Sequence, residues 1–274
     1  MEEKKYVQLQ FSDLTEGQVN QLIALLADVE YDGFEEDENS LKAYIAEEKF
    51  NCTDLEEILK LIPTIYSKSI VVEENWNARW ESSFQPILVG SFVGIRAGFH
   101  KPIPQVEHEI IITPKMSFGT GHHATTFMMI EQMQSISFTD KTVVDFGTGT
   151  SVLAILAEKM GASAVDAIDY DEWSIENSKE NILANQCTKI NLIKADTISA
   201  GPAYDIILAN INYNVIIENL MSIKQASKPG TKIIASGFIK SDEQEMIKAL
   251  KAHGIIHLNT VQKSDWICMF MQAT

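Results

Sequence analysis

Cysteine is scarce in this chain, whose 274 residues contain only Cys52, Cys187 and Cys268. Because the three are odd in number, far apart and without a CxxC spacing, the sequence predicts neither a disulfide framework nor a zinc site. Long apolar runs are also lacking: none approaches the ~20 residues that cross a bilayer, and the first residues do not resemble a signal peptide. We therefore expect a soluble protein of the reducing cytoplasm, without a membrane partner.

Basic residues are few as well, with 22 Lys and Arg against 38 Asp and Glu, a formal charge of −16. Residues 1–75 hold 18 acidic and 6 basic residues, a net charge of −12, which leaves −4 for residues 76–274. Such a field repels a phosphate backbone and attracts a basic protein. Nucleic acid is therefore disfavoured as a direct substrate.

Residues 1–73 are predicted to form a small α+β domain. The expected elements are a strand, a helix, two short strands, a helix and a closing strand, at residues 6–11, 15–29, 33–36, 41–47, 53–61 and 69–73. A capping box from Thr53 to Glu56 is expected to begin the second helix, and Pro63 follows its end. The order βαββαβ is that of a ferredoxin-like domain, which by itself indicates no function.

Residues 74–84 are polar, contain Trp76 and Trp80, and are expected to connect two domains. We favour packing of the two indole rings against either domain over contact with a substrate. In the second domain, expected at residues 85–274, apolar strands alternate with helical patterns from Thr142 onward, including one at residues 215–226. This alternation predicts a parallel sheet covered by helices. Two last strands, at residues 256–261 and 266–271, are expected to form an antiparallel hairpin at the sheet edge.

The second domain contains a glycine turn, where the strand Val143-Val144-Asp145-Phe146 runs into Gly147-Thr148-Gly149-Thr150-Ser151 and then into a predicted helix. Exposed N–H groups at such a helix start can bind an anionic part of a small cofactor. A dinucleotide site would need GxGxxG, but the third glycine position, counted from Gly147, is Val152. The cofactor is therefore not expected to be NAD.

The turn instead matches the acidic-x-Gly-x-Gly pattern of S-adenosylmethionine-dependent methyltransferases, with Asp145 as the acidic residue. Asp169 lies 22 residues after Gly147, at the end of the next apolar strand. A carboxylate there can accept both hydrogen bonds of a ribose diol. The alternatives are that the glycines only turn the chain and that Asp169 caps the next helix.

Asn210 ends a further strand, in Asn210-Ile211-Asn212-Tyr213. Many N-methyltransferases have Asn or Asp followed by Pro-Pro and an aromatic residue here, and only the Asn and the aromatic residue are present. The Asn210 amide could accept a hydrogen bond from the amine that is methylated or bind the cofactor. Termination of the strand is the plain alternative.

Glycine, threonine and histidine are concentrated between Thr113 and Thr126, before a helix expected to begin near Phe127. A metal site at His122 and His123 is not expected, because adjacent side chains rarely point at one ion. We expect a loop over the cofactor, with Thr125 or Thr126 capping the helix.

Taken in order, these segments resemble the bacterial methyltransferases of large ribosomal subunit protein eleven. The resemblance covers essentially the whole chain and rests on WESSFQP at residues 80–86, then FGTGHHATT, VVDFGTGTSVLAI, AIDYDEWSIENSKENI and ANIN. It implies a Rossmann-like class I methyltransferase domain, preceded by the small domain as the part that recognises a basic ribosomal protein. It also implies N-methylation of that protein on its α-amine and lysine side chains.

The resemblance places the cofactor contacts on Thr126, Gly147, Asp169 and Asn210, beside Asp145 and Gly149 of the turn. Ser151 replaces the third glycine but could still donate its backbone N–H. His123 occupies the family's histidine position, so that His123 and Asn210 are the candidates for a catalytic role. Three further departures flank these motifs, at Thr113, His122 and Ala124.

Methylation of an amine requires its neutral form but no general acid, because the leaving group is a neutral thioether. With reference pKa values of ~8 for an α-amine and ~10.4 for lysine, the α-amine is the easier acceptor. Two other functions stay open from the residues alone. One is an amide or nucleobase N-methyltransferase, and the other is a non-catalytic module that binds S-adenosylmethionine as a signal.

Replacement of Asp169 by alanine tests the expected cofactor site. Asp169→Ala should weaken S-adenosylmethionine binding by about 1 to 3 kcal/mol through lost hydrogen bonds to a charged acceptor, without unfolding the chain. Calorimetric titration measures this change, and an unaltered affinity would exclude Asp169 from the site.

Overall fold

The computed structural model describes residues 5–37, 39–72, 85–114, 121, 123–199, 201 and 203–274. Contacts within the chain divide it into two units, residues 1–83 and 84–274. Each unit is described by itself. The predicted connection at residues 74–84, with Trp76 and Trp80, lies outside the described residues.

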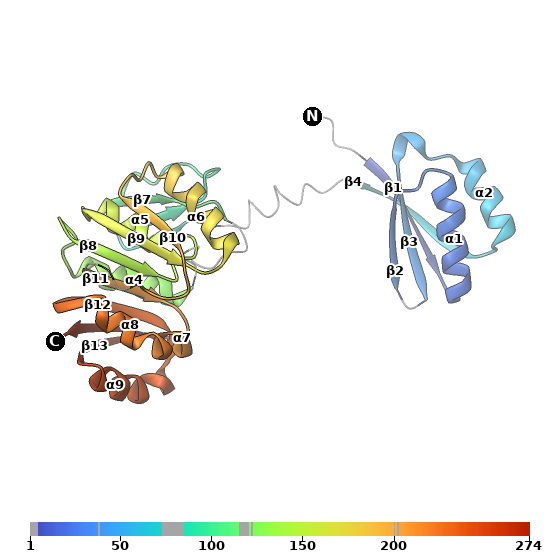
Figure 1. The fold of residues 1–274 in the computed structure, drawn as a ribbon. Helices are drawn as coiled ribbons and strands as arrows, with labels where there is room; N and C mark the ends of the chain where they lie inside the picture. The colour runs from blue at the N-terminus through green and yellow to red at the C-terminus, as the bar shows by residue number, and fades with distance from the viewer. Residues whose placement is uncertain are drawn as a thin grey trace. The chain divides into compact units, whose positions relative to one another are not determined.

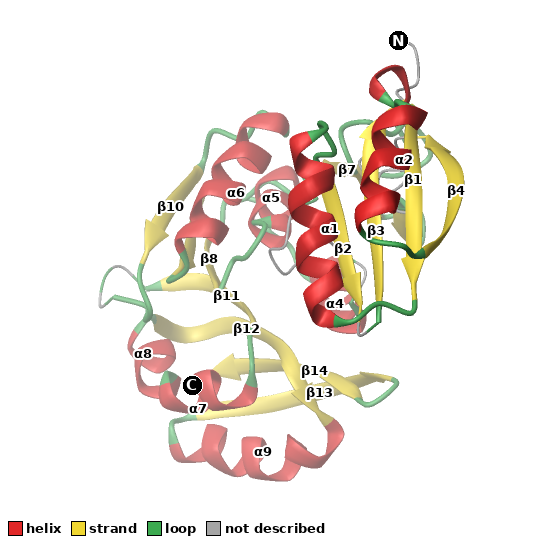
Figure 2. Cartoon of the chain, turned by 90° about the vertical axis from the view of Figure 1, so that its right-hand side faces the viewer, coloured by secondary structure: helices red, strands yellow, loops and turns green. Residues whose placement is uncertain are grey.

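Unit 1 has the predicted element order βαββαβ. Its elements are β1 (Lys5–Ser12), α1 (Glu16–Asp28), β2 (Gly33–Asp37), β3 (Ser40–Ala46), the 3₁₀ helix η1 (Glu47–Lys49), α2 (Cys52–Leu61) and β4 (Ile65–Val72). The strands form one antiparallel sheet in the order β2-β3-β1-β4. Helices α1 and α2 lie against one face of this sheet (Figure 2), where Leu9, Phe11, Leu22 and Leu41 are fully buried.

Two predicted boundaries in unit 1 are wrong. Helix α2 is capped by Asn51, whose side chain accepts a hydrogen bond from the backbone N–H of Thr53 at 2.9 Å. Asparagine caps as well as threonine does and stands two residues earlier, so Thr53 lies within the helix. Strand β4 begins at Ile65, four residues before the predicted start, because it pairs with β1 along its whole length although residues 65–70 are exposed.

Unit 2 is built on a seven-stranded sheet, in the order β10-β9-β8-β11-β12-β14-β13 (Figure 1). Its strands are β8 (Thr142–Phe146), β9 (Ala164–Asp169), β10 (Ile190–Lys194), β11 (Tyr204–Asn210), β12 (Ser227–Ile239), β13 (Ile255–Lys263) and β14 (Trp266–Ala273). The first five in this order are parallel, whereas β14 is antiparallel to both β12 and β13. The predicted parallel sheet with an antiparallel hairpin at its edge is therefore confirmed.

Helices cover both faces of this sheet. They are α4 (Ala124–Gln134), α5 (Val152–Lys159), α6 (Glu172–Ala184), α7 (Tyr213–Glu218), α8 (Leu220–Gln225), α9 (Glu243–Ala252) and the 3₁₀ helix η2 (Lys240–Asp242). One buried cluster includes side chains of α4 and α5, and a second includes side chains of α7, α8 and α9. The single helix predicted for residues 215–226 is wrong, because Asn219 separates α7 from α8. Among the described residues, no helix has the length and apolarity to span a bilayer.

A smaller sheet contains β5 (Ile87–Val89), β6 (Val93–Arg96) and β7 (His108–Ile111), in the order β5-β6-β7. Side-chain amides of α6 hold the chain at the end of β7. Asn185 accepts from the N–H of Ile111 at 2.9 Å and donates to its carbonyl at 2.6 Å. Asn181 accepts from the N–H of Thr113 at 2.8 Å. This strand end precedes residues 115–120 and 122, which lie outside the described residues.

Candidate functional site

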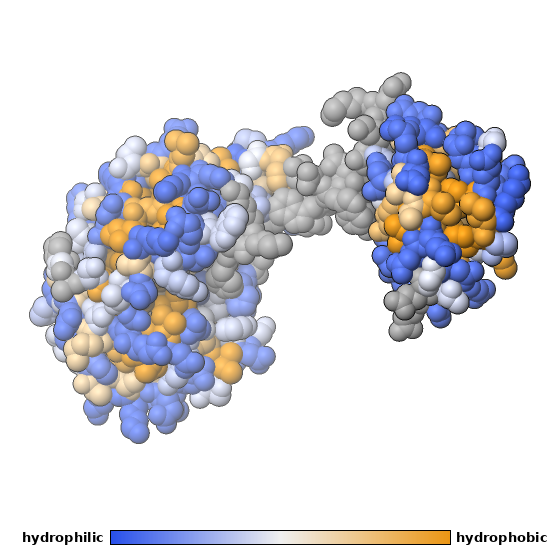
Figure 3. Space-filling view, turned by 45° about the vertical axis from the view of Figure 1, so that its right-hand side comes forward, coloured by the Kyte–Doolittle hydropathy of each residue, from blue (hydrophilic) through white to orange (hydrophobic). Residues whose placement is uncertain are grey.

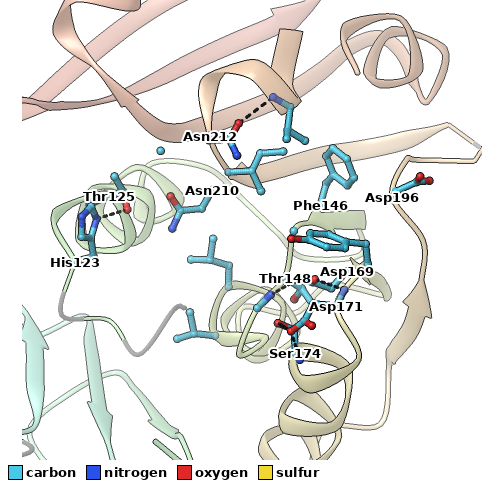
Figure 4. Close-up of a pocket in the computed structure, with 18 of the residues that line it drawn as sticks. His123, Thr125, Phe146, Thr148, Asp169, Asp171, Ser174, Asp196, Asn210 and Asn212 are labelled. Atoms are coloured by element: carbon cyan, nitrogen blue, oxygen red, sulfur yellow. Dashed lines mark hydrogen bonds between the residues drawn. The ribbon is translucent and has the colours of Figure 1, made fainter. Parts of the chain in front are cut away.

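A cavity of about 450 Å³ opens at the carboxyl ends of β8, β9 and β11. Of the predicted site residues, Gly147, Gly149, Asp169, Asn210 and His123 line it. Figure 4 shows His123 on one side of this pocket, Asp169 and Asp196 on the other, and Asn210 between them. Thr126 and Asp145 are fully or almost fully buried and do not line it. The sheet thus brings together residues that are far apart in the sequence.

The backbone N–H groups of the glycine turn are used within the protein. Those of Gly147 and Thr148 donate to the carbonyl of Ile168 at 2.8 and 2.9 Å. Gly149 donates to Asp169 Oδ2 at 2.9 Å, and Ser151 donates to the Thr148 carbonyl at 2.8 Å. These four N–H groups therefore close the turn and bind it to strand β9. Binding of an anionic ligand group by the N–H groups at the start of α5 stays a prediction.

Ser151 fits the glycine position that it occupies. Its φ of 61° lies in the left-handed region, which is unusual for a residue with a side chain. Its hydroxyl donates to Ser178 Oγ at 2.7 Å, and Ser178 donates to the Gly149 carbonyl at 2.7 Å. Asn181 Nδ2 donates to the Thr150 carbonyl at 2.9 Å. Buried hydrogen bonds from Ser178 and Asn181 of α6 therefore hold the turn. Neither residue was predicted as part of the site.

Asp145 holds the turn by hydrogen bonds from its buried carboxylate. Its Oδ2 accepts from Thr148 Oγ1 at 2.6 Å and from the N–H of Ala154 at 3.2 Å. Its Oδ1 is buried without a hydrogen-bond partner among the described residues. Burial raises the pKa of Asp145 to about 7, and the charge of Asp169 adds to this, whereas the hydrogen bonds from Thr148 and Ala154 oppose it. Asp145 therefore positions the turn without reaching the pocket.

Asp169 combines structural contacts with access to the pocket. Besides the bond from Gly149, its Oδ1 accepts from the N–H of Asp171 at 3.0 Å, and its side chain lines the cavity. Each carboxylate oxygen has a second acceptor position. The alternative that Asp169 caps α6 is wrong, because Asp171 is the cap and accepts from Ser174.

The segment Asn210-Ile211-Asn212 passes between two glycines. A Cβ atom on Gly147 would lie 2.1 Å from Ile211 Cγ2, and one on Gly237 would lie 2.3 Å from the Ile211 carbonyl oxygen. Asn210 Nδ2 donates to Thr126 Oγ1 at 3.2 Å. Its buried Oδ1 has no partner among the described residues. Thr126 therefore orients the Asn210 amide, whose Oδ1 can still accept a hydrogen bond.

His123, rather than Thr125 or Thr126, caps α4. The helix begins at Ala124, three residues before the predicted start, and the N–H of Thr125 donates to His123 Nδ1 at 3.4 Å. Thr125 Oγ1 also lies 2.8 Å from this nitrogen. His123 Nδ1 is the acceptor of the bond that caps the helix. The His123 and Trp266 rings form a T-shaped pair, with centroids 4.7 Å apart.

Several lining residues escaped the sequence analysis. Asp196 follows β10, just as Asp169 ends β9. Because the carboxyl ends of neighbouring parallel strands lie at one edge of the sheet, Asp196 was predictable from the sequence as a lining residue. Gly237 also carried a signal, because a glycine within a run of strand residues is a recognised sign of close backbone approach. Trp266 carried no signal, because only the folded hairpin brings it to His123. Phe146, Thr148, Tyr170, Asp171, Ser174, Ile211 and Val215 also line the pocket.

Comparisons with known proteins agree with this arrangement. The model of the family "Ribosomal protein L11 methyltransferase (PrmA)" matches residues 3–274. The chain belongs to the ribosomal protein L11 methyltransferase family. A ribosomal protein L11 methyltransferase of Phocaeicola vulgatus is 36% identical over 257 residues, 90% of this chain and 92% of the relative. Another, of Bacteroides thetaiotaomicron, is 34% identical over 273 residues, 96% of this chain and 97% of the relative.

A solved structure of a ribosomal protein L11 methylase of Lactobacillus delbrueckii subsp. bulgaricus has a TM-score of 0.65 and 23% identity. It covers 70% of this chain and 100% of its own, and at this identity the likeness concerns the fold. The predicted family and the Rossmann-like class I methyltransferase fold are confirmed. The protein is an S-adenosylmethionine-dependent protein methyltransferase.

The pocket of this family member fits its cofactor. S-adenosylmethionine has a sulfonium cation, an ammonium group and a carboxylate, and it has no phosphate. The described lining residues include three aspartates and no lysine or arginine, which favours a ligand with cationic groups over a phosphate. Asn210 Oδ1 and the second lone pairs of Asp169 offer acceptors to the donor groups of such a molecule.

Two glycines of β12 allow a matched test of the close packing at Ile211. Gly237 and Gly230 have φ values of 101° and 91°, but a Cβ atom on Gly230 would meet nothing within 4 Å. Both alanine variants share the strain of a left-handed backbone, and only Gly237→Ala must displace Ile211 and its neighbour Asn210. We expect Gly237→Ala to lower kcat/KM roughly 100-fold relative to Gly230→Ala. Equal losses in both variants, measured with their thermal stability, would contradict this role.

Proposed function

We propose that this enzyme transfers methyl groups from S-adenosylmethionine to amino groups of ribosomal protein L11, at its α-amine and at lysine side chains. Relatives that carry the name of this activity match nearly the full length of the chain. The observation that carries the proposal at the site is the free acceptor Asn210 Oδ1, held by Thr126 between the two sides of the pocket. The cytoplasm, where ribosomal proteins are made, is the compartment that we propose.

The cofactor contacts follow from the donors and acceptors of the pocket. We assign the ribose hydroxyls to the remaining lone pairs of Asp169, and the adenine to Tyr170 and Asp196 at the ends of β9 and β10. Gly147 and Gly149 keep the backbone of the turn free of side chains beside the methionine part of the cofactor. Asp145 and Thr126 act from behind as positioning residues. When bound, S-adenosylmethionine supplies an electrophilic methyl group on a positively charged sulfur.

The acceptor amine needs orientation and a dry environment rather than acid catalysis. Asn210 Oδ1 can accept an N–H of the neutral amine, which turns the nitrogen lone pair away from the amide and towards the cofactor. His123 is assigned to capping α4 rather than to general-base catalysis, because its Nδ1 is engaged with Thr125. Water takes the proton that the amine releases. Catalysis is then mainly positioning and desolvation.

Unit 1 is assigned the recognition of the protein substrate. Its element order and its strand order β2-β3-β1-β4 support a ferredoxin-like domain at residues 1–73, joined by residues 74–84 to the catalytic domain at residues 85–274. The net charge of −12 over residues 1–75 favours a basic protein over a nucleic acid. Apolar side chains are also exposed on unit 1, among them Leu61, Ile65 and Ile70 (Figure 3). Acidic and apolar groups together suit a basic protein surface.

Incubation with methyl-labelled cofactor tests the substrate. A bacterial ribosomal protein fraction and purified ribosomal protein L11 should both give label on one protein, at the α-amine and at lysines. The Asn210→Ala variant should give far less label at equal cofactor occupancy. Label on RNA or on a glutamine amide would support an amide or nucleobase methyltransferase instead, and cofactor binding without any transfer would support a signal-binding module.

A salt series tests the part of unit 1 in recognition. Attraction between its acidic surface and a basic substrate is screened over ~8 Å at physiological salt and over ~3 Å at 1 M. The KM for ribosomal protein L11 should therefore rise steeply with ionic strength, while the KM for the cofactor changes little. Parallel or absent changes in the two constants would leave the acidic residues as solubilising groups only.

A further inference from the structure

The two sides of the pocket differ in charge. The lining carboxylates are at the ends of two neighbouring strands: Asp169 ends β9, Asp171 follows it, and Asp196 follows β10. On the opposite side, the described lining residues are uncharged apart from the imidazole of His123. Figure 4 shows this separation, with His123 and Thr125 facing the three aspartates across Asn210. The side of His123 therefore has no carboxylate among the described residues to stabilise a cation.

Methyl transfer nevertheless creates a cation on the acceptor. The nitrogen lone pair forms the new N–C bond, the C–S bond breaks with its electron pair on sulfur, and the positive charge passes from sulfur to nitrogen. A primary or secondary amine then loses a proton to water. A tertiary amine has no proton to lose, so the product of a third transfer stays permanently charged.

Asn210 cannot serve every stage of this chemistry. A neutral primary amine has two N–H groups, a monomethylated amine has one, and a dimethylated amine has none. Asn210 Oδ1 can therefore hold the first two forms by a hydrogen bond, but not the third. Further methylation at one nitrogen requires a group that attracts the substituted nitrogen without a hydrogen bond.

Trp266 meets this requirement. It is the first residue of β14, paired with Ile239 of β12 and Lys263 of β13, so two strands fix its backbone. Its ring lines the pocket and packs against His123, with an angle of 73° between the planes. Thr125 holds His123 in turn. An indole face is the strongest aromatic site for a cation, and a quaternary ammonium group binds there without any N–H donor.

We propose that Trp266 is a specificity-determining residue, whose indole face binds the alkylated nitrogen of the acceptor and permits methylation beyond the monomethyl stage. This inference rests on the proposed amine methylation, and it deepens it by naming the residue that accommodates the methylated forms. A carboxylate in this place would favour the protonated amine, which has no lone pair for methyl transfer. The uncharged indole ring attracts a cationic nitrogen without accepting a hydrogen bond from a proton on that nitrogen.

Binding of a charged probe tests the inference without catalysis. N-acetyl-trimethyllysine amide and its neutral isostere, with a quaternary carbon in place of the nitrogen, are titrated against the protein saturated with S-adenosylhomocysteine. The wild type should prefer the charged probe by about 5- to 30-fold. Trp266→Leu should show no preference, and Trp266→Phe should keep part of it. Equal affinity of the wild type for both probes would overturn the proposal.

The distribution of products gives an independent test. With ribosomal protein L11 as substrate, mass spectrometry should show Trp266→Leu accumulating monomethylated amines, at unchanged cofactor affinity. Trp173, on α6, is 75% exposed and does not line the pocket, so Trp173→Leu is the matched control and should keep the wild-type distribution. A wild-type distribution in Trp266→Leu, or a loss of cofactor affinity, would overturn the role. A wild type that labels no amine would refute the proposed function, while the probe pair still decides the role of Trp266.

Discussion

The site depends on the close passage of Ile211 between two glycines. The Ile211 side chain occupies the space above Gly147, and its backbone occupies the space above Gly237. The turn after β8, the residue after β11 and the last part of β12 therefore meet closely, with no side chain at either glycine to separate them. Because Asn210 and Asn212 flank Ile211, their positions follow from this contact. Interiors as densely packed as this one transmit small displacements directly to neighbouring groups.

The polar groups of the glycine turn are also used within the protein. The N–H groups of Gly147, Thr148 and Gly149 bind β9, and the carbonyls of Gly149 and Thr150 accept hydrogen bonds from α6. These bonds fix the turn before a ligand binds. The pocket then offers acceptors on Asp169 and Asn210, which suit a ligand that carries hydroxyl and ammonium groups.

Residues at strand ends were predictable from the sequence, because parallel strands carry their carboxyl ends to one edge. Gly147, Gly149, Asp169 and Asn210 were found in this way and line the pocket. Trp266 and Asn181 were not, since their roles arise from contacts between distant segments. The cap at Thr53 was misassigned because Asn51, two residues earlier, caps a helix equally well. The cap near Thr125 was misassigned because His123 is not among the preferred N-cap residues, yet its ring accepts from the N–H of Thr125.

Two side-chain amides at the carboxyl end of helix α6 take the place of a neighbouring strand at the end of β7. These amides, at Asn181 and Asn185, are about 6 Å apart along the helix axis, close to the ~6.6 Å between alternate residues of a strand. They can therefore bind Thr113 and Ile111 in register, much as a paired strand would. An unpaired strand edge invites pairing with another chain and aggregation. At the end of β7, a helix closes that edge, and the small sheet needs no further strand there.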